Sequence, residues 1–257
     1  MKILLLDIET APHRAYVWGL WDQNVAQDQI EKAGYTLCWA AKWLGDKKAM
    51  FASVYRDGRK AMLRGIYDLI NEADVVIHYN GTRFDMPTLN QEFVKAGLKP
   101  PAPYKQIDLL KTVKKQFRLP MNKLDYVAQH LGLPGKRRHK GMALWTGCME
   151  GDAESWKEME GYNRQDVEVL QGVYEKLKPW VPNHPNHALY NDSDSGGEPV
   201  HICPSCGGHH LHRRGTSKTA TMIYQRYQCQ DCGAWSRERT NMVSKEKRKT
   251  VLVQDRG

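Results

Sequence analysis

The sequence predicts an α/β domain followed by a small, cysteine-built domain, and three observations support this fold class. Residues 3–6 and 74–79 are short apolar runs without helical periodicity, which is typical of buried strands. Residues 59–73 and 154–179 carry apolar side chains at helical spacing. Two Cys-x-x-Cys pairs lie between residues 203 and 232. A chain of 257 residues has room for one sizeable α/β domain and one such appendage.

The composition is that of a soluble globular protein with a polyanionic partner. Hydrophobic residues make up 41% of the chain and charged residues 26%, and the net charge of +9 favours nucleic acid first and an anionic membrane surface second. No apolar run approaches the roughly 20 residues that span a bilayer, and no signal peptide is recognisable. We therefore expect a cytoplasmic protein without a membrane partner, located in the host cytoplasm if its source is viral.

The first predicted strand ends in two acids, Asp7 and Glu9. Because side chains alternate across a strand, both carboxylates point to one side and Ile8 to the other. They lie at the carboxyl end of a buried strand, where open α/β sheets place their sites. Two negative charges so close repel unless a proton or a cation separates them, and oxygen ligands favour magnesium or manganese. Acids at a strand end are also commonly solvated or cap a turn. These two residues alone therefore do not decide whether the strand ends in a metal site.

The segments after this strand predict a small sheet and its first helix. Residues 11–34 are rich in aromatic and polar side chains and indicate an irregular excursion. Residues 36–43 and 49–55 have the pattern of two strands of a hairpin, which would form a meander with the first strand. A helix over 59–73 then leads into the buried strand at 74–79.

A turn from Asn80 to Asp85 follows the second apolar run. Gly81 permits a tight turn and Pro87 suits a first helical turn, so a strand should pass into a helix over 88–97 at this point. From there the carboxylate of Asp85 can face the first two acids. The alternative is that Asp85 is only a helix N-cap, a position that aspartate favours.

Further helices and a basic loop complete the predicted domain. One helix begins near Asp108, which we expect to cap it, and a shorter one over 119–132 ends at a glycine. The basic loop at 136–140 is either a solvated surface or a phosphate contact beside a metal site. The last and longest helix covers 154–179 and ends at a proline.

This last helix places Tyr162 and Asp166 one turn apart on a single face, although Tyr162 alone could be packing and Asp166 alone could be solvated. In chain order the sequence contains three short motifs, Asp7-x-Glu9, Asn80-x-x-x-Phe84-Asp85 and Tyr162-x-x-x-Asp166. This set resembles the three exonuclease motifs of the DEDD superfamily of DnaQ-like, ribonuclease H-like enzymes, in the DEDDy subclass that carries tyrosine in the third motif. The resemblance covers roughly residues 1–180.

The resemblance implies a ribonuclease H-like fold, with a mixed central sheet flanked by helices, over a domain of residues 1–181. It also implies a hydrolase that removes nucleotides from 3′ ends with two magnesium or manganese ions. Asp7, Glu9 and Asp166 would hold the catalytic ion. Asp7 would also reach the second ion, which Asp85 would hold directly or through water, and Tyr162 would orient the attacking water. The nucleic-acid contacts that we expect in this domain are Thr10, Asn80, Phe84, Arg137, Arg138 and Lys140.

The C-terminal cysteines form two knuckles. They are Cys203, Cys206, Cys229 and Cys232. Glycine follows each pair, and four sulfurs at this spacing match a tetrahedral structural site for one Zn²⁺. The segment resembles a zinc ribbon, which we place at 201–240, after a linker at 182–200 and before a basic tail at 241–257. The stretch of this tail that begins at Lys245 is expected to be disordered when free. The alternatives are a pair of disulfides, which a reducing cytosol disfavours, and substitution of a ligand by a nearby histidine.

The basic character of the chain belongs to this appendage. Residues 201–257 contain 11 Lys and Arg against 4 Asp and Glu, whereas the rest of the chain contains 27 against 25. Cations interleaved with aromatic side chains indicate a nucleic-acid surface, and the alternative is a merely solvated basic face. The contacts that we expect here are Arg213, Arg214, Arg226 and Trp235. The ribbon also offers a surface for a protein partner.

These patterns lead to one main function and two alternatives. We expect a metal-dependent 3′–5′ exonuclease acting on nucleic-acid 3′ ends, with single-stranded DNA as the first candidate and the ribbon aiding substrate binding. One alternative is an adaptor that binds nucleic acid without cutting, although a binding module has no need of four clustered carboxylates near phosphates. The other is a structure-selective ribonuclease H-like endonuclease. The sequence leaves the choice between DNA and RNA and the oligomeric state open.

Overall fold

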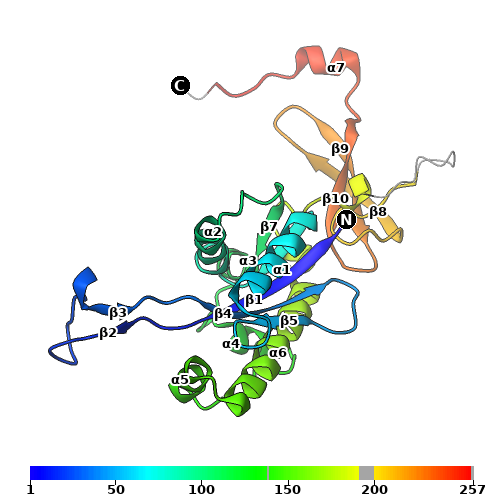
Figure 1. Ribbon diagram of the computed structural model, residues 1–257. Helices are drawn as coiled ribbons and strands as arrows, with labels where there is room; N and C mark the ends of the chain where they lie inside the picture. Colours follow the sequence, from blue (N-terminus) through cyan, green and yellow to red (C-terminus); the bar gives the residue numbers. More distant parts are fainter. Residues whose placement is uncertain (138, 191–199, 256–257) are drawn as a thin grey trace. The chain divides into compact units, whose positions relative to one another are not determined.

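The computed structural model describes residues 1–137, 139–190 and 200–255 (Figure 1). The chain divides into two compact units, of which one is residues 2–176 and the other is residue 1 together with residues 177–257. Among the described residues, no helix is both long enough and apolar enough to cross a membrane. The first unit carries the predicted carboxylates, and the second carries the predicted cysteine cluster.

A five-stranded mixed sheet forms the centre of the first unit, in the order β5-β4-β1-β6-β7. Its strands are β1 (Ile3–Thr10), β4 (Thr36–Trp43), β5 (Met50–Ser53), β6 (Val75–His78) and β7 (Lys105–Asp108). β1 runs antiparallel to β4 and parallel to β6, so it lies in the middle of the sheet. The predicted α/β fold with a mixed central sheet is therefore confirmed.

Helices pack on both faces of this sheet, so side chains on opposite faces of β1 contact different helices. The helices of this unit are α1 (Arg59–Glu72), α2 (Asp85–Lys95), α3 (Leu109–Gln116), α4 (Leu124–His130), α5 (Met142–Glu150) and α6 (Ala153–Leu177). Ile8 belongs to the core that β1 shares with α1 and α2. Asp7 lies on the opposite face, where Asn163 of α6 contacts it. The alternation expected for the first strand is confirmed.

Most of the predicted elements are present, with shifted ends. The hairpin of β4 and β5 and its meander with β1 match the prediction, as do α1 and α6. α2 begins at Asp85, earlier than expected, and α4 begins at Leu124, later than expected, because Lys123 still has an extended backbone. Helix ends are the least determined part of a sequence pattern because end residues share the composition of the adjoining loop.

Two elements were missed because their sequences lack periodicity. β7 pairs in parallel with β6 at the edge of the sheet, although its sequence Lys-Gln-Ile-Asp contains a single apolar residue. α5 opens with the continuous apolar run Met-Ala-Leu-Trp, which shows no polar face. In both cases neighbouring elements supply the stabilising contacts that the local pattern does not reveal.

The excursion at 11–34, predicted to be irregular, contains a two-stranded ribbon. β2 (Arg14–Ala15) pairs antiparallel with β3 (Ile30–Lys32), and a 3-10 turn over Gln27–Gln29 precedes β3. The prediction was wrong here because strands of two and three residues carry no readable alternation. We call residues 14–32 the arm, because they project from the sheet in Figure 1.

The second unit is built on a three-stranded antiparallel sheet in the order β10-β9-β8. Its elements are β8 (Leu211–Lys218), β9 (Ile223–Cys229), β10 (Trp235–Asn241) and α7 (Lys245–Thr250). The side chain of Ser244 caps α7 by accepting a hydrogen bond of 3.2 Å from the N–H of Lys247. The expectation that this basic segment is disordered is therefore wrong for α7, because a cap satisfies its first turn.

The segment predicted as a linker, 182–200, falls only partly within the described residues. His187–Tyr190 form a 3-10 turn, and the backbone N–H of His187 donates to the carbonyl of Pro204 at 2.9 Å. Residues 191–199 lie outside the described part of the chain. The described end of the segment therefore contacts the first cysteine knuckle.

Candidate active site and metal centres

Three of the four predicted carboxylates converge in the first unit. Oxygen atoms of Asp7, Glu9 and Asp166 lie within 4.8 Å of one another. Asp7 and Glu9 extend from one face of β1, and α6 packs on this face and contributes Asp166, which is buried. The packing of α6 on the sheet thus brings two neighbouring acids and one distant acid together.

Asp85 lies beside this cluster, at the first residue of α2. Its Oδ1 accepts a hydrogen bond of 3.2 Å from the backbone N–H of Ile8, and its negative charge helps to raise the pKa of Asp7. The N-cap position of α2 is occupied by Phe84 instead. The capping alternative is therefore wrong, and the Asp85 carboxylate is directed to β1.

Asp108 holds the turn that leads into α2. It caps α3 as predicted, and its two oxygens also accept hydrogen bonds from the backbone N–H groups of Asn80 (2.9 Å) and Thr82 (3.3 Å). The left-handed residue of the turn is Asn80, with φ of 68°. Gly81 is needed for space, because a Cβ there would overlap the imidazole of His78. The turn therefore depends on a carboxylate from β7, which sequence analysis expected only to cap a helix.

A cation already faces the carboxylates. The ammonium group of Lys136 forms an ion pair with Asp166 Oδ2. Burial lowers the pKa of Lys136, but the charges of Asp166 and Asp7 outweigh this effect and raise it. Lys136 comes from the basic loop, which sequence analysis considered a solvated surface or a phosphate contact. The structure instead pairs it with a site carboxylate, and its only sequence signal was its place in that basic run.

Burial raises the pKa of every acid in the site, and neighbouring negative charges raise the pKa of Asp7, Glu9 and Asp85 further. Burial is the largest cause for Glu9 and Asp85, and each pKa is raised to about 7. The pKa of Asp7 lies well above its usual range because of burial and the charges of Asp85 and Glu9. Burial also raises the pKa of Asp166, although Lys136 acts against this shift. Carboxylates that retain protons near neutral pH suit a site in which a divalent cation replaces those protons.

One oxygen of Asp166 is suited to a metal ion. Asp166 Oδ1 is buried and has no hydrogen-bond partner among the residues that the structure describes, whereas Oδ2 pairs with Lys136. A buried carboxylate oxygen without a partner is costly. Three converging carboxylates with such an oxygen fit a hard divalent cation that prefers oxygen ligands, such as magnesium or manganese.

Asn163 holds the Asp7 carboxylate in place, and sequence analysis missed it. Its Nδ2 donates a hydrogen bond of 2.7 Å to Asp7 Oδ2, and the residue is fully buried. Its Oδ1 accepts from the thiol of Cys38 on β4 at 3.9 Å. The only sequence signal was the position of Asn163 inside the third motif. The amide fixes the orientation of a carboxylate that its neighbours repel.

Tyr162 belongs to an aromatic cluster beside the carboxylates. Its ring centroid lies 5.0 Å from that of His139 and 6.2 Å from that of Trp145. The indole of Trp145 hydrogen-bonds to Glu9 and lowers the pKa of that acid. Burial and the charge of Asp166 raise the pKa of the Tyr162 hydroxyl above its ordinary value. Tyr162 therefore stays protonated at neutral pH and can act as a hydrogen-bond donor.

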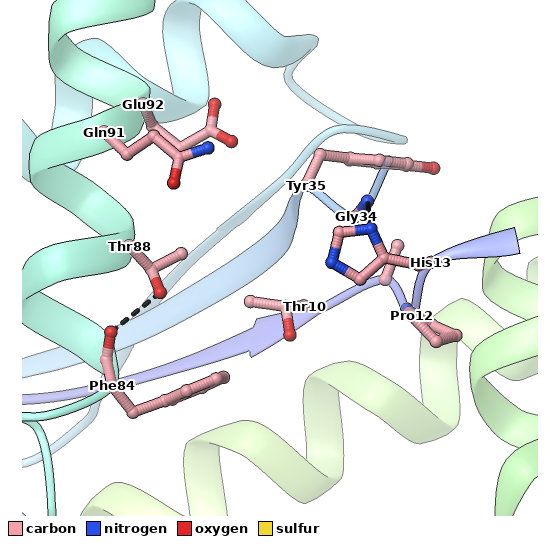
Figure 2. Close-up of a pocket in the computed structure, with 10 residues that line it drawn as sticks. Thr10, Pro12, His13, Gly34, Tyr35, Phe84, Thr88, Gln91 and Glu92 are labelled. Carbon is pink, nitrogen blue, oxygen red and sulfur yellow. Dashed lines mark hydrogen bonds between the residues drawn. The ribbon is translucent and has the colours of Figure 1, made fainter. Parts of the chain in front are cut away.

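Two pockets open beside Thr10, the last residue of β1. The first has a volume of about 300 Å³, and Figure 2 shows the side chains of Thr10, Phe84 and Tyr35 around it. The second has a volume of about 310 Å³ and is lined by His139 and Trp145 on its other side. These volumes are at the lower end of those of small-molecule sites. Of the predicted nucleic-acid contacts, Thr10 and Phe84 thus line a pocket.

The predicted contacts in the basic loop lie apart from these pockets. Arg137 is exposed and lies over α6 at Gly161, where a larger side chain would meet the guanidinium group. Lys140 forms an ion pair of 3.5 Å with Glu158. Arg138 lies outside the described residues. The structure therefore links both described residues to α6.

The first unit is similar to a known protein family. Residues 4–178, well over half of the chain, match the model of the family described as the RNase_H superfamily. The chain belongs to this superfamily. Membership supports nuclease activity on a nucleic-acid substrate, and it agrees with a site made of carboxylates.

The RNase H fold is also found in a solved structure. The family B DNA polymerase from the hyperthermophilic archaeon Pyrobaculum calidifontis is similar at a TM-score of 0.53 and 19% sequence identity. The match covers 69% of this chain and 24% of the polymerase chain. No curated protein matches the sequence. At this identity the likeness shows a shared fold, and the predicted ribonuclease H-like fold is confirmed.

After the RNase H domain, four cysteines meet in the second unit. The Sγ atoms of Cys203, Cys206, Cys229 and Cys232 lie within 4.8 Å of one another, and all four are free thiols. Two of the sulfur–sulfur distances are 3.7 Å. A tetrahedron with Zn–S bonds of about 2.3 Å has edges of about 3.8 Å. The cluster fits a small zinc-binding domain, and the nearby His210 is paired with Asp231 at 2.7 Å instead.

The predicted nucleic-acid contacts of this unit lie on its sheet. Arg213 and Arg214 belong to β8, Arg226 to β9 and Trp235 to β10. The guanidinium group of Arg226 lies 4.6 Å from the centroid of the Trp235 ring, and its Nε donates to the carbonyl of Arg214 at 3.1 Å. The structure thus brings three of these residues together as a cation over an aromatic face.

Proposed function

We propose that this chain is a metal-dependent 3′–5′ exonuclease of the DEDDy subclass that removes nucleotides from the 3′ ends of single-stranded DNA. The observation that carries the proposal is the convergence of Asp7, Glu9 and Asp166 within 4.8 Å, at a buried carboxylate oxygen without a partner among the described residues. Membership of the RNase H superfamily supports a nuclease. The order of the three motifs, with Tyr162 in the third, supports this subclass.

Each site residue has its own role in the proposed reaction. Asp7, Glu9 and Asp166 would hold one divalent ion, and Asp85 would help Asp7 to hold another. When bound, two such ions activate a water and stabilise the charge that develops in an in-line displacement at phosphorus. Tyr162 donates a hydrogen bond that orients the attacking water, because its hydroxyl stays protonated.

The two pockets beside Thr10 receive the last nucleotides of the strand in this proposal. Phe84 and Tyr35 in the first pocket and Trp145 in the second offer aromatic faces on which bases can stack. Thr10 borders both pockets and follows Glu9 on β1. A DNA strand bound in these pockets would therefore pass next to the carboxylates.

The second unit acts as a zinc ribbon that raises affinity for the substrate. Four cysteine thiolates hold one structural Zn²⁺, and the excess of Lys and Arg in residues 201–257 attracts phosphates. The pair of Arg226 and Trp235 adds a stacking face. Removal of the ribbon should therefore weaken DNA binding and flatten its salt dependence, and an unchanged salt slope would contradict this role.

A digestion assay tests the proposal. Single-stranded DNA labelled at its 5′ end is incubated with Mg²⁺ or Mn²⁺ and either the intact protein, Asp7→Asn or the control Asp68→Asn, which changes an exposed acid of α1. We expect stepwise shortening from the 3′ end by the intact protein and the control, and none by Asp7→Asn.

The same assay distinguishes the alternatives. Cleavage of circular single-stranded DNA would favour an endonuclease, and tight binding without cleavage of DNA or RNA would favour an adaptor. An RNA strand of the same sequence, run in parallel, decides between the two substrates. Either of the first two outcomes would overturn the proposal.

A further inference from the structure

The arm exposes an apolar tip. Its large apolar side chains are Tyr16, Val17, Trp18, Leu20, Trp21 and Val25, with exposed fractions from 45% to 99%. Trp18 is the most exposed of them, at 99%, and Trp21 is 84% exposed. In the described parts of the chain, the other exposed large apolar side chains come singly or in adjacent pairs from separate elements. A concentrated apolar surface of this kind marks an interaction site.

Polar contacts within the arm hold its backbone in a defined shape. The N–H of Tyr16 donates to the carbonyl of Gln29 at 2.9 Å, and the side-chain amide of Gln29 donates back to the carbonyl of Tyr16 at 3.0 Å. The Gln29 side chain also accepts from the N–H of Ala26 at 2.7 Å. An ion pair of 3.7 Å joins Arg14 and Glu31 at the base. These contacts are polar, so the apolar side chains remain available to a partner.

The charges of the tip argue against nucleic acid as its occupant. Between Ala15 and Ile30 the sequence contains no Lys or Arg, and its only charged residues are Asp22 and Asp28. Platforms for single strands combine aromatic faces with cations that hold the phosphates. Arg226 over Trp235 in the second unit has this character, whereas the tip of the arm does not. The tip therefore suits an apolar protein surface.

We propose that the tip of the arm binds the same tip of a second copy of this chain, forming a two-fold symmetric dimer. In a symmetric contact each patch meets itself, and a patch without charges at Tyr16–Trp21 brings no like charges together. The concentration of tryptophan and tyrosine is typical of the residues that contribute most to binding energy. This inference does not depend on nuclease activity.

The exposed area of the tip is sufficient for such a dimer. An aromatic side chain can bury about 150 to 250 Å². At their exposed fractions, the six side chains together offer on the order of 800 Å², which is what each partner contributes to an interface of standard size. The contact is apolar and its only nearby charges are like charges, so added salt should strengthen it.

Sedimentation equilibrium of the purified full chain tests the proposal over a series of concentrations and at low and high salt. We expect a mass that rises toward twice that of the 29.5 kDa chain, more readily at high salt. The triple variant Trp18→Ser/Leu20→Ser/Trp21→Ser should have the mass of one chain throughout. The control Val94→Ser/Met121→Ser removes exposed apolar side chains elsewhere in the unit and should behave like the intact chain.

The outcomes separate the possible occupants of the tip. The substituted side chains are exposed, so an unchanged circular dichroism spectrum is expected for the triple variant and shows that it is folded. A monomeric intact chain at every concentration, or a dimeric triple variant, would overturn the proposal. A monomeric chain whose binding to single-stranded DNA falls in the triple variant would assign the tip to nucleic acid instead. Mass is measured without substrate, so failure here leaves the proposed nuclease untouched.

Discussion

The two clusters of potential metal ligands in this chain, the carboxylates and the cysteines, differ in how the surrounding fold supports them. The carboxylates stand on β1 and α6, which belong to a domain with a large apolar core of its own. The cysteines instead make up most of the small core of their unit, where Ala234 and Leu211 are the other members of the cluster among the residues that the structure describes. Loss of one ligand should therefore affect function in the first cluster and folding in the second.

The electrostatics of the carboxylate cluster support the same distinction. Burial raises the pKa of all four carboxyl groups, and neighbouring negative charges add to this for Asp7, Glu9 and Asp85, so the RNase H domain tolerates an unfavourable arrangement for the sake of its site. A large core can offset such a cost, whereas we expect a unit of three short strands to lose its shape without the proposed zinc ion.

The largest effect is expected for Cys203→Ser. Structural zinc in small domains supplies about 10 to 16 kcal/mol of apparent binding free energy, so loss of one ligand should unfold the second unit. We expect the NMR amide signals of β8 to β10 to lose their dispersion, the zinc content to fall and the signals of the RNase H domain to stay. Ser205→Ala, which lies between the ligands Cys203 and Cys206, should change none of these. Retained dispersion of β8 to β10 without zinc would break the contrast.

A smaller but still severe effect, on activity alone, is expected for Asp7→Asn. Loss of this carboxylate should lower the rate of digestion by on the order of 10³-fold or more, since it contributes to both ions of the proposed site. In a chelator, the midpoint of thermal unfolding should stay the same or rise, because one of the repelling charges is removed. A clear fall in this midpoint would mean that the carboxylates support the fold.

An intermediate effect is expected for Asn163→Leu, which removes the donor to Asp7 while it fills a similar volume. Mutation of a residue that orients a metal ligand typically lowers the metal affinity by about 10- to 100-fold. We expect Mn²⁺ binding, measured by calorimetric titration without DNA, to weaken by that amount, while the KM for DNA changes little. Gln129→Leu, on the exposed side of α4, serves as the matched control. Equal Mn²⁺ affinities of Asn163→Leu and the intact protein would rule out a positioning role.

The smallest effect concerns pH. Glu9 and Asp85 have pKa values of about 7 in the folded chain, against about 4 in an unfolded chain. The folded state therefore binds more protons between these values, and the free energy of unfolding of the metal-free protein should fall as pH rises from about 5 to 7. The fall should be on the order of 1 kcal/mol per group.

Urea denaturation in a chelator at several pH values measures this trend. Saturating Mn²⁺ should remove most of it, because the ion replaces the protons of the site. Asp7→Asn should show a shallower dependence than the intact protein, since the remaining acids repel less. Stability that rises with pH over this interval in the chelator would contradict the raised pKa values.

Local patterns in the sequence were enough to predict several parts of the molecule. Four apolar residues before two acids specify β1 and the common side of Asp7 and Glu9, and a helical period sustained over 25 residues specifies α6. The spacing of the cysteines specified their meeting, because two short Cys-x-x-Cys turns, one before β8 and one at the end of β9, have few other ways to approach. These features depend on residues within one element or one turn.

The side chains that contact the carboxylates could be identified only from the folded structure. Lys136 pairs with Asp166, 30 residues away, and Asn163 donates to Asp7, 156 residues away. No spacing rule connects such residues, because their meeting depends on how α6 and the basic loop pack against the sheet. The exposed tip of the arm was beyond the sequence for the same reason, since the aromatic side chains of residues 16–21 become a surface only when no other part of the fold covers them.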